Sequence, residues 1–263
     1  MDRDDARSLA LPTALLLLGA ASAAFDVGCV LIKTPFLRPG VTLGDLIETA
    51  GVFVVLALFA RVGRLAAGGI ASGAALLTGF AAAAFALGHG AHVAANSIHD
   101  LAERSGAGDP TGLLDFWDER VGHYAVDSGR ILFAVALLGQ PAPSGEGPLA
   151  AARGGRASSE SGPTTRRLLP ALLVALGGAA YGFTTFASAV EGQTVPLVLP
   201  FYALAAVAVV VLARAGRGQP WIRFFFGSAA GTALLFFLIW GIWQHGFPEF
   251  TRAGIIHGAG GPG

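Results

Sequence analysis

The chain has few charged residues, and this shortage excludes a soluble globular fold. Asp, Glu, Lys and Arg together make up 13% of the 263 residues, about half of the ~25% that is usual in a soluble domain. Seventeen basic residues balance seventeen acidic ones, and the absence of a basic tract argues against nucleic-acid binding. Hydrophobic residues make up 54% and the mean hydropathy is +0.63, which indicates an integral membrane protein.

Cysteine is almost absent as well. Cys29 stands alone, which excludes an internal disulfide framework and a cysteine-based zinc site. The apolar runs are longer than the strands of an outer-membrane barrel, and they lack the alternation of polar and apolar residues that such strands show. These absences leave a helical membrane protein.

Seven apolar segments are long enough to cross the hydrocarbon core, for which about 20 residues are needed. They span residues 9–32, 46–62, 65–94, 121–138, 168–190, 195–213 and 221–243. The sequence therefore predicts an all-α integral membrane protein, a seven-transmembrane helix bundle with four spans in residues 1–139 and three in residues 168–250. Residues 140–167 are rich in Pro, Gly, Ser and Ala and are predicted to be a disordered cytoplasmic linker. Residues 251–263 are predicted to be a flexible tail.

The basic residues predict the orientation of the spans, because Lys and Arg concentrate on the cytoplasmic side. Arg130 lies inside the fourth span, and eleven other basic residues lie near span ends on the side of the N-terminus. The remaining five are Lys33, Arg38, Arg104, Arg120 and Arg252. The N-terminus is therefore predicted to be cytoplasmic and the C-terminus extracytoplasmic, in the plasma membrane or bacterial inner membrane. The first span could also be a signal peptide cleaved after Ala23, but its acidic start favours retention.

Pairs of glycines four positions apart predict close packing between spans, since small residues let helix backbones approach each other in a membrane. The pairs are Gly69 and Gly73, Gly178 and Gly182, and Gly227 and Gly231. Gly88 and Gly90, which flank His89, are expected to allow a similar approach.

Nearly all ionisable groups other than arginine gather at the extracytoplasmic ends of the predicted spans. Residues at i, i+3, i+4 and i+7 share one helix face, so helical spacing arranges these groups in stripes. The two most polar stripes hold His89, His92 and Asn96 in span three, and Glu119, His123, Asp127 and Arg130 in span four. Polar groups at similar depth in other spans are Ser22, Asp26, Glu48, Tyr181, Thr184, Ser188, Glu191 and His245. Span six contributes none.

The histidines predict a metal site near the extracytoplasmic face. Ionisable groups inside a span are costly unless they pair or face a wet cavity, so they mark function by default. The preferred ligands are His89 or His92, His123 and His245. Imidazole together with carboxylate suits zinc or non-haem iron.

Carboxylates around these histidines are candidates for supporting roles. The candidate further ligands or general bases are Glu48, Glu119 and Glu191, with Asp127 and Asn96 holding imidazoles in place. Plainer interpretations exist beside these. Asp45, Asp115 and Asp118 lie near helix starts, where carboxylates cap free N–H groups. Asp127 and Arg130 could form only a mutually neutralising pair.

The predicted site indicates a metal-dependent enzyme. A metal held by three His, or by two His and a carboxylate, activates a bound water at its open position, and a nearby carboxylate can take up the proton. A site that opens between helices near the membrane face favours a lipid or other amphiphile as substrate. Hydrolysis is preferred over iron-dependent oxidation. The oligomeric state is not predicted.

Two other classes of function remain open. The stripe of His123, Asp127 and Arg130 could carry protons or cations in a transporter. Below Arg130, however, the fourth span is apolar from Ile131 to Leu138, which argues against a continuous path. Alternatively, His92 and His123 could be the axial ligands of a haem in an electron-transfer protein.

In architecture, seven spans with a His and acid cluster resemble the seven-span membrane metal-hydrolase superfamily that includes alkaline ceramidases and progestin-type receptors. That family carries a His-x-x-x-His pair in its last span, where this chain has His245 alone. Its metal also lies toward the cytoplasmic side, opposite to the side predicted here. The chain is therefore not assigned to that family.

Overall fold

Seven helices in the described part of the chain are long and apolar enough to cross a membrane, which confirms the predicted helical seven-span architecture. The structure, a computed structural model, describes residues 3–32, 35–36, 38–67, 72–108, 111–140 and 165–255. Most of the predicted linker, the predicted tail beyond residue 255, and Gly69 lie outside these residues. The direction in which the spans cross the membrane stays a prediction.

The helices follow one another as an up-and-down bundle. They are α1 (Arg3–Leu31), α2 (Leu43–Ala67), α3 (Ser72–Arg104), α4 (Leu113–Asp115), the π-helix η1 (Phe116–Gly122), α5 (His123–Leu138), α7 (Thr165–Glu191), α8 (Val195–Arg214) and α9 (Pro220–Trp243). The elements α4, η1 and α5 form one span, which therefore begins at Leu113 and not at residue 121 as predicted. A short antiparallel hairpin, β1 (Pro35–Phe36) and β2 (Arg38–Thr42), joins α1 to α2; the sequence pattern did not predict it.

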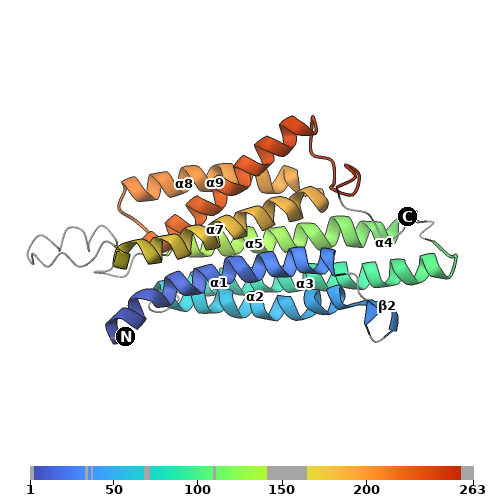
Figure 1. The fold of residues 1–263 in the computed structure, drawn as a ribbon, viewed down its shortest axis with the longest axis horizontal. Coiled ribbons are helices and arrows are strands. Elements are labelled where there is room, and N and C mark those ends of the chain that lie inside the picture. Colours follow the sequence, from blue (N-terminus) through green and yellow to red (C-terminus); the bar gives the residue numbers. More distant parts are fainter. Residues whose placement is uncertain are drawn as a thin grey trace, which may run out of the picture.

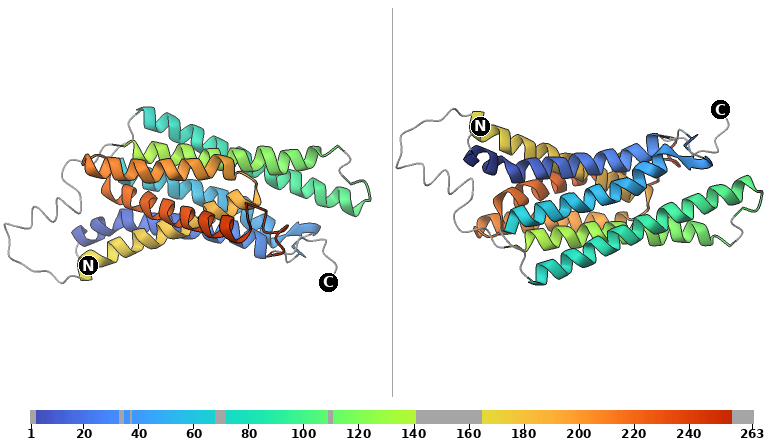
Figure 2. Two further views of the ribbon diagram at one scale, coloured as in Figure 1. Left: turned by 90° about the horizontal axis from the view of Figure 1, so that it is seen from above. Right: turned by 90° about the horizontal axis from the view of Figure 1, so that it is seen from below.

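An odd number of spans places the start of α1 and the end of α9 at opposite ends of the bundle (Figure 1). Helix α7 packs between α1 and α9, α3 packs along α5, α2 lies against α1, and α8 lies against α9. The α3–α4 hairpin extends beyond its neighbours at the end away from the start of α1 (Figure 2). Helix α3 has 33 residues and is about 50 Å long at 1.5 Å per residue, which exceeds the ~30 Å hydrocarbon core.

Aromatic side chains fill the centre of the bundle. Phe59, Phe85, Phe133, Tyr181 and Phe225 are all buried. Their ring centroids lie 3.7–6.4 Å apart in contacting pairs, so these contacts tie together α2, α3, α5, α7 and α9. Large apolar side chains remain exposed on the outside of the helices, as expected for a surface that faces lipid.

One of the predicted glycine pairs, Gly178 and Gly182, brings two helix backbones close together. A Cβ added at Gly178 or Gly182 would overlap with α9, at Gly182 with the backbone of Ala229. At Gly73 and Gly231, no neighbouring atom lies within 4 Å of such a Cβ. The close approach predicted at these two positions is therefore wrong.

The closest contact of α3 with η1 and α5 also depends on glycine. A Cβ at Gly88 would overlap with backbone atoms of Gly122 and Val126, and one at Gly129 would overlap with the backbone of α3. Gly90 was expected to act like Gly88, but it faces open space. Because these glycines let the backbones approach each other, the part of α3 that carries His92 lies close to η1.

We predict that Gly88→Ala lowers the free energy of unfolding by about 1–3 kcal/mol, because the added methyl overpacks the contact between α3 and α5. Gly90→Ala is the matched control, since it makes the same change two residues away on an open face and improves helix propensity equally. Chemical unfolding of both variants in detergent measures the difference. Equal stability of the two variants would contradict the proposed contact.

Candidate metal centre

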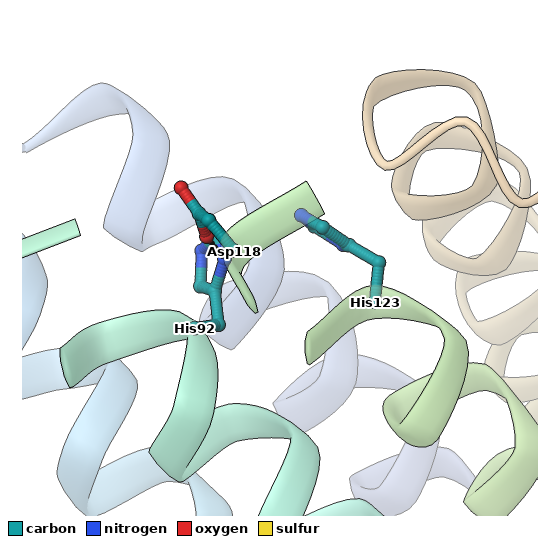
Figure 3. A group of neighbouring side chains, drawn as sticks. All are labelled: His92, Asp118 and His123. Atoms are coloured by element: carbon teal, nitrogen blue, oxygen red, sulfur yellow. Dashed lines mark ion pairs between the residues drawn. The ribbon is translucent and has the colours of Figure 1, made fainter. Parts of the chain in front are cut away.

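Two histidines and one aspartate from separate elements meet at the end of the bundle away from the start of α1. His92 of α3, Asp118 of η1 and His123 at the start of α5 each offer a ligand atom, and these atoms all lie within 4.8 Å of one another. His92 Nδ1 contacts Asp118 Oδ1 as an ion pair, and the rings of His92 and His123 have centroids 4.6 Å apart. Figure 3 shows the carboxylate of Asp118 beside the imidazole of His92, with the ring of His123 turned toward both.

The π-helix η1 explains how Asp118 joins His123. The two residues are five positions apart, and in an α-helix of 3.6 residues per turn they would point about 140° away from each other. The i→i+5 turn of a π-helix brings them to the same face, and such turns are frequent at functional sites. Asp115, the N-cap of η1, makes no side-chain capping bond, so the capping role predicted for it is wrong. Asp118 contacts His92.

Polar groups on the far side of the ring hold His92 in position. His92 Nε2 lies 3.5 Å from Glu48 Oε1 and 3.4 Å from Asn96 Nδ2, while Nδ1 faces Asp118. A carboxylate on the second ring nitrogen is the usual support of a metal-bound histidine. Glu48 also lies 3.4 Å from His89 Nδ1. His89 precedes His92 by about one helical turn and is outside the group of three.

One buried polar atom beside this group has no hydrogen-bond partner among the described residues. It is Glu119 Oε2, which lies 3.9 Å from His123 Nε2. His92 Nδ1 and Asp118 Oδ1 contact each other. Buried polar groups in native structures are nearly always satisfied, and exceptions call for an explanation such as an ion.

The turn between α7 and α8 covers His123. A Cβ at Gly192 would overlap with the imidazole of His123, so only glycine fits at this position without moving the ring. Thr194 in the same turn donates a hydrogen bond from Oγ1 to Asp127 Oδ2. The turn is thereby anchored to α5 next to the candidate ligands.

The other predicted site residues lie outside the group. His245 is exposed in the turn after α9. Glu191 accepts a hydrogen bond of 2.9 Å from the backbone N–H of Phe250 and so holds the C-terminal segment. Asp127, expected to hold an imidazole, instead contacts Arg130 and the hydroxyl of Thr194.

Asp127 belongs to a buried ionic network below the candidate ligands. Arg130 donates to Asp26 Oδ2 of α1 at 2.5 Å and to Asp127 Oδ1 at 3.2 Å. All three residues are buried or nearly so. The predicted pairing of Asp127 with Arg130 is therefore present, and Asp26 completes it.

Two features of the site were not predicted from the sequence. Asp118 was interpreted as a capping residue, and the only available signal for its role was its position five residues before His123. Thr194 and Tyr202 are the polar groups that α8 and its N-cap contribute, since Tyr202 donates to Thr185 Oγ1 at 3.1 Å. The prediction that span six contributes no polar group is therefore wrong.

We predict that Arg130→Met lowers the free energy of unfolding by about 3–5 kcal/mol, because it leaves two carboxylates buried without their cation. The control is Arg252→Gln, which removes an exposed partner of Glu249 and should cost about 1 kcal/mol or less. Chemical unfolding in detergent compares the two. A loss for Arg130→Met no larger than for Arg252→Gln would contradict a buried ionic network.

His92, Asp118 and His123 thus form a candidate metal centre built from three separate elements. No protein-family model matches the chain, and neither a curated protein nor a solved structure is found to be similar to it. The indications of function therefore come from the chain's own residues.

Proposed function

We propose that the protein is a membrane metalloenzyme that binds zinc or non-haem iron at His92, Asp118 and His123 and hydrolyses a lipid or other amphiphile. The observation that carries the proposal is the convergence of these three side chains within ligand distance of one another. The buried Oε2 of Glu119, which has no hydrogen-bond partner among the described residues, and the support of His92 by Glu48 favour an ion over a purely structural ion pair.

The ligand set has the composition of a catalytic site. Two imidazoles and one carboxylate leave coordination positions open, as in zinc hydrolases. A metal at such a site supplies a Lewis acid and an activated water at neutral pH. Glu119 is the candidate general base, because its Oε2 is buried and lies next to His123 without a hydrogen-bond partner in the described part of the chain.

Oxidation of a lipid is the second candidate reaction. Two histidines and one carboxylate are also the ligand set of non-haem iron oxygenases. The hydrolase is preferred because Glu119 offers a base beside the ligands, whereas an oxygenase needs no such group.

The haem and transport alternatives receive less support. The rings of His92 and His123 contact each other directly at 4.6 Å, and a haem between them would have to separate them. For transport, Arg130 is neutralised by Asp26 and Asp127, and the next buried side chain along α5 is the apolar Phe133.

If the N-terminus is cytoplasmic, as the basic residues predict, this chemistry takes place outside the cytoplasm. The candidate ligands lie at the end of the bundle opposite to the start of α1. With a cytoplasmic N-terminus in a plasma membrane, the site opens toward the extracytoplasmic leaflet. Membrane lipids are therefore the nearest source of substrate.

The wild-type protein purified in mild detergent should retain zinc or iron near one ion per chain. We predict that His123→Ala and Asp118→Ala each reduce retention more than about tenfold, since even the outer partners of a metal ligand contribute roughly 10- to 100-fold in affinity. His245→Ala is the control, because His245 lies outside the group of three. Elemental analysis measures the content and distinguishes zinc from iron. Equal metal content in all variants would refute the site.

We predict that Glu119→Gln keeps the metal but lowers hydrolysis of fluorescent glycerolipids by about 10²- to 10⁴-fold, the usual contribution of a general base. Glu249→Gln is the control, because Glu249 is a nearby acid that pairs with Arg252. Turnover and metal content are measured on the same samples. Loss of the metal from Glu119→Gln would show that Glu119 is a ligand and not the base.

A further inference from the structure

Two open hollows lie on either side of Arg120 and Tyr124 on the outer face of η1 and α5. The first has a volume of about 650 Å³ and is also lined by Phe116, Val121, Ala125 and Ser128. The second has a volume of about 450 Å³ and lies between α5, the start of α8 and Phe247, with Gln193, Val195, Pro196, Leu199 and Pro200 completing its lining. Both hollows are open to their surroundings and are not enclosed cavities.

Arg120 is an exposed cation between two apolar surfaces. It has no salt bridge within the described residues, although its neighbours Asp118 and Glu119 face His92 and His123. Phe116 and Trp117 are exposed less than one turn away, as is typical of side chains at the level of lipid headgroups. The charge of Arg120 is therefore available to an anion at that level.

The second hollow adjoins the candidate metal centre. Gln193, on its rim, follows Gly192, which lies against the imidazole of His123. Gln193 has a φ of 54°, a left-handed conformation that costs free energy for a residue other than glycine and often occurs at functional sites. On the other side, Arg120 directly follows Glu119, whose carboxylate is next to His123.

We propose that Arg120 binds the anionic headgroup of a membrane lipid with two acyl chains, and that one chain lies in each of the two hollows. Charge complementarity selects the headgroup, because a charge-assisted hydrogen bond from a guanidinium to a phosphate oxygen is among the stronger polar contacts. The apolar linings on both sides suit hydrocarbon chains. The second hollow reaches the metal centre through Gln193, which follows Gly192 against His123, so this lipid is the substrate class of the proposed metalloenzyme; that last step rests on the proposed function.

Native mass spectrometry tests the lipid site directly. The purified protein is incubated with equal amounts of phosphatidylglycerol and phosphatidylcholine carrying the same acyl chains, and the lipid retained by each variant is counted. The wild type should retain phosphatidylglycerol in excess. Arg120→Gln should reduce this preference about tenfold, the effect of losing one hydrogen bond to a charged group. Arg252→Gln, which removes another exposed arginine of the same end, should leave the preference unchanged.

Two further arms separate the possible sources of an effect. Leu199→Trp fills the second hollow and should reduce retention of both lipids, whereas excess inorganic phosphate should not displace bound phosphatidylglycerol. No preference in the wild type, or an unchanged preference in Arg120→Gln, would overturn the proposal. Metal content is measured on the same samples, so that a lipid preference without metal would refute the metalloenzyme and leave the lipid site standing.

Discussion

The close contact between α3 and the η1–α5 span is the interaction on which the candidate site depends. Gly88 and Gly129 have no side chains to keep the backbones apart, and the contact continues at Gly122, where an added Cβ would lie 3.1 Å from the Cβ of His92. Lipid offers no hydrophobic driving force between helices, so packing of small residues has to supply it. Because the two backbones are this close, His92 reaches Asp118 and His123, which are separated from it in sequence by the end of α3 and by α4.

The π-helix η1 is the second requirement, and it acts on a single span. Its wider turn brings Asp118 into line with His123, while Arg120, between them in sequence, is exposed on the outer surface. One helical segment thereby presents candidate ligands inward and a cation outward. The proposed metal site and the proposed lipid site therefore share a backbone, and a change of helical register in η1 would disturb both.

The buried network of Asp26, Arg130 and Asp127 has a different role. It links α1 to α5, and through Thr194 it links α5 to the α7–α8 turn. That turn carries Gly192, which lies against His123. Charges in a membrane interior are costly unless they are paired, so the network favours one arrangement of these elements. The network stabilises the elements around the candidate ligands, but none of its residues belongs to the group of three.

Composition and hydrophobic length by themselves determined the helical class and the seven spans, because a run of about 20 apolar residues matches the thickness of the hydrocarbon core. The positions of the polar residues along the spans also indicated the end of the bundle at which they gather. Helical periodicity also paired Asp127 with Arg130, which are three positions apart on one helix. Tertiary structure decided the rest. Periodicity assumes 3.6 residues per turn, so it separated Asp118 from His123, which a π-helix unites. Periodicity also gave no means to distinguish Gly88, which meets another backbone, from Gly90, which faces open space. In the same way, it did not separate His92, which reaches Asp118, from His245, which is exposed. These differences arise from the packing between helices and not from the spacing of residues within one helix.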